Sequence, residues 1–174
     1  MYLEWYLKEQ AAGEKTLEET VVELLAEKGF HITTAESCTG GMIAGTLVNV
    51  AGASEVLNEG YVTYSNEAKE RLLGVASETI SDYGVVSRQT AAEMAAGAAK
   101  TAHTTIALSS TGVAGPDGGT KEHPVGDVYL GCCYNGSVMT QHMLGCGSRT
   151  EIRQQAVAAA FSLLEKMLTE EKIL

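Results

Sequence analysis

The sequence has little positive charge. It holds 12 Lys and Arg residues against 22 Asp and Glu residues, which gives a formal net charge of -10. Proteins that bind the phosphate backbone of DNA or RNA do so largely through clustered Lys and Arg. The basic residues here are spread along the chain and form no basic run. The composition therefore argues against a nucleic-acid partner.

Long apolar runs are also absent. No uninterrupted stretch is long enough to cross a bilayer, and residues 1–15 are too polar and acidic for a secretory signal peptide. We therefore expect no membrane partner and a cytoplasmic protein.

The four cysteines contain no Cys-x-x-Cys pair. A chain of 174 residues, 45% of them apolar, buries enough surface to fold without disulfides or a structural metal. We therefore interpret the cysteines as reduced, mostly buried thiols. His142 and Cys146 are four positions apart, but along a predicted strand this spacing separates them by about 13 Å, so we expect no zinc site.

Helix and strand signals alternate along the chain. Thr16 and Glu19 form a capping-box pattern, and Gly29 should end the helix that they begin. Further helices are predicted over about 42–50, 65–74, 87–101 and 149–168. Strands are predicted over about 30–35, 60–64, 105–110, 127–134 and 137–144, the last two joined by the hairpin signal Asn135-Gly136.

This order of elements predicts an α/β fold, a three-layer α/β/α sandwich with a mixed β-sheet. We expect residues 16–174 to form a single domain and residues 1–15 to be an N-terminal extension. Tyr2, Leu3, Trp5 and Tyr6 of that extension have the spacing of a short peripheral helix.

Three polar loops follow predicted strands, at residues 36–41, 64–69 and 111–119. In open α/β sheets, ligands bind beyond the carboxyl ends of the strands. We therefore expect these loops to converge on one crevice.

The first loop places Ser37 at a strand-to-helix turn. Gly40 and Gly41 would let backbone N–H groups approach a ligand, and the start of the next helix favours an anion or a developing oxyanion. Alternatively, Ser37 or Thr39 caps that helix. The loop lacks both the Gly-x-Ser-x-Gly elbow and the lysine of a Walker loop, and no histidine suggests a Ser-His-Asp triad.

The second loop offers a base for a serine nucleophile. Tyr64 and Lys69 can both face the loop of Ser37, and a buried lysine loses its proton more easily. The alternative is an ordinary solvated lysine beside Glu67 and Glu70. Hydride transfer is not expected, because the sequence lacks both Tyr-x-x-x-Lys at this position and a Gly-x-Gly-x-x-Gly after the first strand.

The third loop is rich in glycine and lies in the stretch that also holds Asp117 and Asp127. Its backbone either passes close to a phosphate, ribose or carboxamide, or forms a plain surface turn. Arg149 and Arg153, one helical turn apart, are a positive pair suited to a phosphate. Pairing with Glu151 or helix packing is the alternative for these arginines.

Three segments in the same order and spacing identify a family. TTAESCTGG, VTYSNEAKERLLGV and SSTGVAGPDGG, the last followed by PVGDVY, resemble the CinA C-terminal domain family, whose enzymes are nicotinamide-nucleotide amidases. The resemblance covers about residues 16–168. TGVAGP replaces the commoner SGIAGP, and residues 1–15 carry no family motif.

The resemblance implies hydrolysis of nicotinamide mononucleotide to nicotinate mononucleotide and ammonia in pyridine nucleotide salvage, without a metal or other cofactor. It also implies an α/β/α fold and a homo-oligomer. A non-catalytic nucleotide-binding or regulatory module of the competence-damage-inducible type is the alternative.

Carried onto this sequence, the resemblance makes Ser37 the nucleophile, Lys69 its base and Tyr64 the third catalytic member. N–H groups of the 38–41 turn or of residues 112–115 would hold the oxyanion. The residues expected to bind the substrate are Thr39, Gly40, Gly41, Thr111, Gly112, Ala114, Gly115, Arg149 and Arg153.

Overall fold

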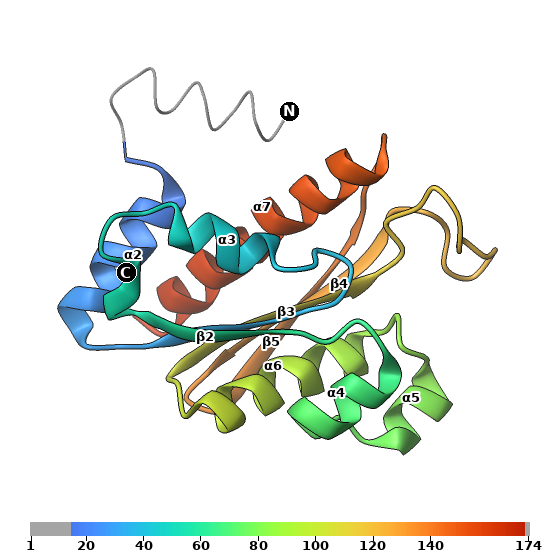
Figure 1. Cartoon of the computed structure of the whole chain (residues 1–174), viewed down its shortest axis with the longest axis horizontal. Coiled ribbons are helices and arrows are strands. Elements are labelled where there is room, and N and C mark those ends of the chain that lie inside the picture. Colours follow the sequence, from blue (N-terminus) through green and yellow to red (C-terminus); the bar gives the residue numbers. More distant parts are fainter. Residues whose placement is uncertain (1–14, 173–174) are drawn as a thin grey trace.

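The computed structural model describes residues 15–172, which form one mixed sheet with helices on both faces (Figure 1). The strands are β1 (Ile32–Glu36), β2 (Leu57–Val62), β3 (Ile106–Gly112), β4 (Asp127–Tyr134) and β5 (Ser137–Leu144). One face carries α2 (Leu17–Lys28), α3 (Met42–Val48) and α7 (Arg149–Glu170), and the other α4 (Asn66–Leu73), α5 (Ser77–Tyr83) and α6 (Arg88–Ala102). A short 3-10 helix, η1 (Ala53–Glu55), precedes β2. The predicted α/β fold is confirmed.

Strand β1 lies inside the sheet, between edge strand β2 and central strand β3, in the order β2-β1-β3-β4-β5. It is parallel to both neighbours, since Ala35 pairs with Tyr61 of β2 and with Ser109 of β3. Strands β4 and β5 add antiparallel pairs, joined at Asn135-Gly136 as predicted. Because β1, β2 and β3 run in one direction, the segments that follow them emerge at the same edge of the sheet.

Local capping signals set the helix boundaries that the sequence predicted. Thr16 and Glu19 form the capping box of α2, and Gly29 ends that helix in the left-handed conformation, with φ 65°. Ser65 caps α4, and Gly74 ends it in the same way. The sequence did not predict α5, which buries no residue and has no side-chain cap, so it carries neither an apolar stripe nor a start signal.

Apolar side chains pack on both faces of the sheet, and small residues bring the layers together. On the α6 face, alanines at 91, 95 and 98 are fully buried. A Cβ atom added to Gly97 of α6 would overlap the carbonyl of Leu73 at the end of α4. The Ala-rich helix α6 therefore packs closely not only on the sheet, as its composition suggested, but also on the neighbouring helix α4.

The helix predicted from Tyr2, Leu3, Trp5 and Tyr6 lies outside the described residues. Between residues 15 and 172, no helix combines the length and apolar character needed to cross a membrane. Cys38, Cys132 and Cys133 are buried free thiols, whereas Cys146 is exposed.

Gly97→Ala is expected to lower the free energy of unfolding by about 1–3 kcal/mol, because the new methyl group collides with the Leu73 carbonyl. Gly45→Ala in α3 is the matched control, since nothing lies within 4 Å of its added Cβ. Alanine there should be neutral or stabilising by up to about 1 kcal/mol. Urea unfolding followed by circular dichroism measures both, and equal effects would contradict the packing argument.

Candidate active site

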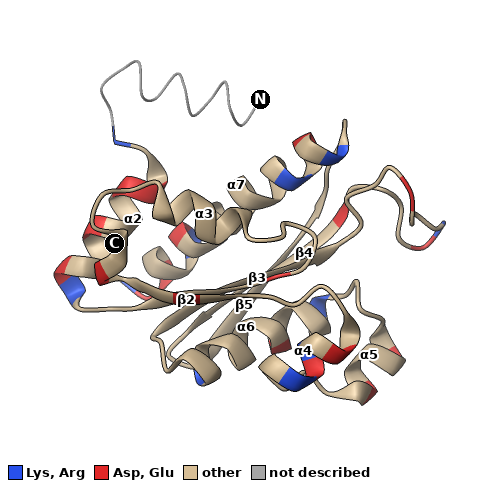
Figure 2. Ribbon diagram, in the orientation of Figure 1, with Lys and Arg blue, Asp and Glu red and all other residues tan. Residues whose placement is uncertain are grey.

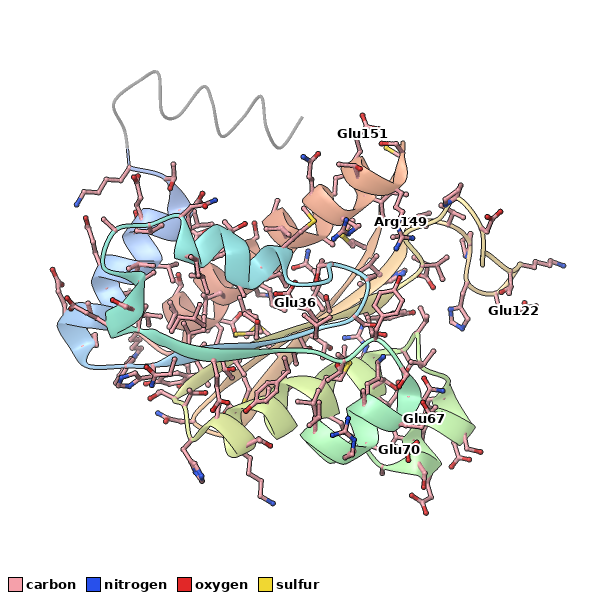
Figure 3. All side chains as sticks on the ribbon, in the orientation of Figure 1. Glu36, Glu67, Glu70, Glu122, Arg149 and Glu151 are labelled. Atoms are coloured by element: carbon pink, nitrogen blue, oxygen red, sulfur yellow. The ribbon has the colours of Figure 1, made fainter. Side chains whose placement is uncertain are left out.

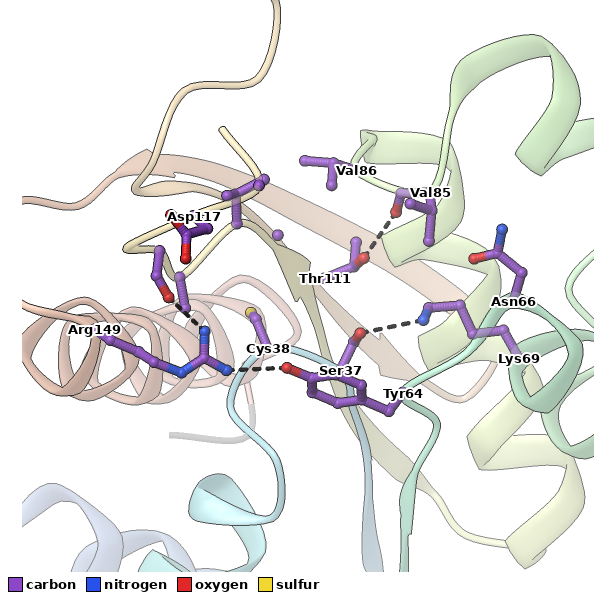
Figure 4. Close-up of a pocket in the computed structure, with 15 residues that line it drawn as sticks. Ser37, Cys38, Tyr64, Asn66, Lys69, Val85, Val86, Thr111, Asp117 and Arg149 are labelled. Carbon is purple, nitrogen blue, oxygen red and sulfur yellow. Dashed lines mark hydrogen bonds between the residues drawn. The ribbon is translucent and has the colours of Figure 1, made fainter. Parts of the chain in front are cut away.

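A cavity of about 280 Å³ lies at the edge of the sheet where β1, β2 and β3 end (Figure 4). Its wall comprises Ser37, Cys38, Tyr64, Asn66, Lys69, Val85, Val86, Thr111, Gly112, Val113, Ala114, Gly115, Asp117, Gly118 and Arg149. The structure thus brings the three predicted loops together. It adds the segment between α5 and α6 and the first turn of α7.

Lys69 is a buried amine in this cavity, with only 1% of the residue exposed. Its Nζ donates to Ser37 Oγ at 3.1 Å and to the Thr63 carbonyl at 2.8 Å. Within the described part of the chain it pairs with no carboxylate. Burial lowers the pKa of Lys69, because the charged amine loses its hydration. The solvated-lysine alternative is therefore wrong, and neutral Lys69 can accept the proton of Ser37.

Cys38 is a second potential nucleophile beside Ser37, but burial suppresses it. The residue is 5% exposed, and loss of hydration raises the pKa of its thiol to about 11. The thiolate, rather than the thiol, is the reactive form of cysteine. Ser37, with its hydroxyl bonded to an amine, is the better activated of the two.

The turn that follows Ser37 is held by Glu36, the last residue of β1. This carboxylate is fully buried between α3 and the sheet, whereas the other glutamates labelled in Figure 3 are exposed. Its oxygens accept hydrogen bonds at 2.6–3.0 Å from Thr39 Oγ1 and from the N–H groups of Gly41, Ile43 and Ala44. Glu36 therefore supplies the negative charge that the start of α3 attracts.

Glu36 changes the interpretation of the first loop. The N-cap of α3 is Gly41, so neither Ser37 nor Thr39 caps the helix. Because a carboxylate of the protein already occupies the helix start, a substrate anion cannot bind there. Thr39 is fully buried and bonds Ser110 Oγ at 2.6 Å. Thr39, Gly40 and Gly41, all expected to bind substrate, do not line the cavity.

Arg149 and Tyr64 lie together at the cavity. Arg149 donates to the Gly115 carbonyl at 2.6 Å and to the Tyr64 hydroxyl at 2.9 Å. Tyr64 is 62% exposed, so its ring lies at the opening rather than inside. Figure 4 shows its hydroxyl joined to Arg149, while Ser37 is joined to Lys69.

Arg153, one turn further along α7, does not line the cavity. Its Nε donates to the Cys38 carbonyl at 3.1 Å and its Nη2 to the Thr39 carbonyl at 2.6 Å. The alternative in which the arginines pair with Glu151 is wrong, because that carboxylate bonds Ser148. The predicted pair thus divides into a cavity residue, Arg149, and a residue that holds the Ser37 turn.

The four residues of the third loop that were expected to bind substrate, Thr111, Gly112, Ala114 and Gly115, all line the cavity. Its glycines permit close contacts within the protein. A Cβ atom at Gly112 would overlap the Asp127 carbonyl, and one at Gly115, where φ is +72°, would lie 2.5 Å from Val125 Cγ1. The expected close approach therefore exists, but it is to the returning chain.

Asp127 anchors the end of this loop. Its carboxylate is buried and bonds His123 Nδ1 at 2.8 Å and His142 Nε2 at 2.5 Å. The ring of Tyr129 stacks on His142, with centroids 4.5 Å apart. Over residues 15–172, no group of three or more potential metal ligands is present. Asp127 thus links the glycine loop to strand β5.

Several residues that the structure places at the site were not predicted from the sequence. Asn66 and Val85 line the cavity directly, and Asp117 was noticed without being given a role. Glu36 acts from beneath the turn. A signal for Glu36 was present: an acid ends an otherwise uncharged strand, and Gly41, directly before the predicted helix, has no side chain to cap it.

Residues 14–168 match the family model of the CinA C-terminal domain. The chain is 53% identical over 156 residues to a CinA-like protein of Kosmotoga olearia, covering 90% of this chain and 38% of the relative. It thus spans about two-fifths of the length of such curated relatives.

Solved structures agree with this match. The competence/damage inducible protein CihA of Agrobacterium tumefaciens superposes with a TM-score of 0.84 at 45% identity, covering 86% of this chain and 92% of that chain. The competence damage-inducible protein A (ComA) of Klebsiella pneumoniae gives 0.84 at 35%, covering 88% and 95%. With its motifs, fold and relatives in agreement, the chain belongs to the CinA C-terminal domain family.

Proposed function

We propose that the chain is an amidohydrolase that converts nicotinamide mononucleotide to nicotinate mononucleotide and ammonia. The observation that supports this most directly is the buried Lys69 amine, 3.1 Å from Ser37 Oγ. A serine hydroxyl is a weak nucleophile until a neighbouring base removes its proton. A lysine whose pKa is lowered by burial can be that base.

The proposed reaction has two halves. In the first, neutral Lys69 takes the Ser37 proton as Oγ bonds to the carboxamide carbon, and the C–N bond of the tetrahedral intermediate then breaks. The proton that Lys69 took is relayed through Tyr64 to the nitrogen, which leaves as ammonia. Lys69 is then neutral again, and the nicotinoyl group remains as an ester on Ser37. In the second, Lys69 deprotonates a water that attacks the ester, which releases the carboxylate and restores the serine.

Tyr64 and Arg149 have separate roles in this proposal. The Tyr64 hydroxyl accepts a hydrogen bond from Arg149, so its own proton can pass to the departing nitrogen, and the proton held by Lys69 replaces it. Arg149 would take the nucleotide phosphate, because it lines the cavity and Arg153 does not. The four third-loop residues that were expected to bind substrate, all of which line the cavity, would contact the remainder of the substrate. A homo-oligomer stays a prediction.

The alternative of a non-catalytic binding module explains less. A lysine buried without a carboxylate destabilises the fold, because charging it there is costly. A module that only binds nucleotides has no need of an amine bonded to a serine. Relatives and structural neighbours carry competence and damage names, which describe no chemistry.

Wild-type protein is expected to release ammonia from nicotinamide mononucleotide, and Ser37→Ala should lower the rate by at least about 10³-fold, because the nucleophile is lost. Ser137→Ala, at an exposed serine of β5, is the matched control and should keep the wild-type rate. Rapid-quench mass spectrometry should locate the acyl group on Ser37. Binding without turnover would favour the regulatory module, and an adduct on Cys38 would reassign the nucleophile.

The pH profile should report on Lys69. Because only the neutral amine accepts a proton, kcat should rise with pH, with a midpoint below the ordinary lysine value of 10.5. Lys69→Arg should abolish both the activity and the rise of kcat with pH, since arginine stays protonated. A midpoint at or above 10.5 would argue against a buried lysine base.

The same shift predicts a change in stability. The folded-state pKa of Lys69 lies below its unfolded value, so the unfolded chain binds more protons between those two values. The free energy of unfolding should therefore increase with pH through that window. Lys69→Met should remove the increase, as measured by urea unfolding across pH.

A further inference from the structure

Arg153 reaches the Ser37 turn from the side of α7. Its guanidinium donates to two successive carbonyls, those of Cys38 and Thr39. Gly40, in the left-handed conformation with φ +59°, lies beneath it, and an added Cβ would be 3.3 Å from Arg153 Nη2. The glycine therefore leaves room for the cation against the backbone.

A chain of hydrogen bonds leads from this cation toward the cavity. The Thr39 carbonyl shares a peptide group with the N–H of Gly40, which donates to the Ser37 carbonyl at 3.2 Å. The Ser37 carbonyl in turn shares a peptide group with the N–H of Cys38. Because hydrogen bonds in a chain polarise one another, the charge of Arg153 strengthens Cys38 N–H as a donor.

The Cys38 N–H is the donor at the end of this chain. It has no oxygen acceptor among the described residues, while the N–H groups of Gly40 and Gly41 are bonded to Ser37 and Glu36. Cys38 also lines the cavity and directly follows Ser37. In hydrolases with a serine at a strand-to-helix turn, the N–H after the nucleophile helps to hold the oxyanion.

We infer that Cys38 N–H holds the oxyanion formed from the carboxamide oxygen, and that Arg153 is the positioning residue that orients and polarises it. This rests on the proposed amidase function. Glu36 secures the Gly41 N–H of the turn, and Arg153 secures two of its carbonyls. The turn is thus fixed on both sides, and Arg153 acts on the transition state without binding the phosphate.

Steady-state kinetics of Arg153→Met on nicotinamide mononucleotide and on its riboside test the inference. An oxyanion donor acts mainly in the transition state, so kcat should fall by about 10–100-fold with KM nearly unchanged, equally for both substrates. Arg149→Met should instead raise KM for the mononucleotide. Arg88→Met, at an arginine bonded to Thr140 outside the cavity, should match wild type.

Two kinetic results would overturn the inference. A defect confined to KM and lost on the riboside would make Arg153 a phosphate ligand. An unchanged kcat would show that the hydrogen-bonded peptide groups do not transmit the charge of Arg153 to Cys38 N–H. If the riboside is not a substrate, the division between kcat and KM on the mononucleotide decides alone. Arg153→Lys, which keeps the charge but cannot reach both carbonyls as a planar fork, should show a smaller loss of kcat.

The backbone amide of Cys38 gives a readout that does not need turnover. Its proton resonance should move upfield in both Arg153 variants, because a less polarised N–H is more shielded, whereas Arg88→Met should leave it in place. An unmoved resonance in folded Arg153→Lys overturns the inference even if ammonia release is confirmed. If wild type releases no ammonia, the proposed function fails, while the resonance still tests the polarisation.

Discussion

The carboxylate of Glu36 at the end of β1, an inner strand of the sheet, sets the path of the chain beyond it. A buried carboxylate is tolerated only when hydrogen bonds replace its water, and here one hydroxyl and three N–H groups do so. Because these donors come from both the turn and the first turn of α3, satisfying the charge fixes both at once. Thr39 consequently points inward, and Ser37 stands at the cavity.

Parallel pairing of β1 with both neighbours then brings a buried amine to that serine. The segment after β2 leads into α4, which begins at the Ser65 cap, so Lys69 falls in the first turns of a helix beside the Ser37 turn. Packing of α4 on α6 at Gly97 keeps the helix close to the domain. The fold thereby buries an amine that would otherwise be solvated, at a cost to stability that is typical of functional sites.

The elements that the sequence predicted well depend on residues only a few positions apart. The capping box of α2, the glycine ends of α2 and α4, and the Asn135-Gly136 hairpin are such cases. Strand β2 begins at Leu57 rather than near Gly60, because an edge strand with mostly exposed residues shows no apolar alternation. Helix α5 was not predicted either, because it buries no residue and so has no apolar stripe.

The site was predictable where a side chain carries the chemistry and less so where backbone is the partner. Ser37 and Lys69 stand out by residue type, and the structure joins them. Glu36 bonds mostly N–H groups, and Arg153 bonds carbonyls of residues more than a hundred positions away. Backbone partners leave no mark on the spacing of side chains, so these roles appear only in three dimensions.

Under the proposed function, the cavity would have to accept an anionic substrate and yet keep Lys69 neutral. A phosphate monoester carries a charge of about -2, and such a charge near Lys69 would favour the protonated amine. The positive charge of Arg149 would offset the phosphate charge. Among the described residues, Arg149 bonds only the neutral oxygens of Tyr64 and Gly115, so no carboxylate there neutralises it. Figure 2 shows the blue segments at the start of α7, on a chain with net charge -10. A phosphate held at Arg149 would place binding and proton transfer on different residues, so that the substrate's charge would not protonate Lys69.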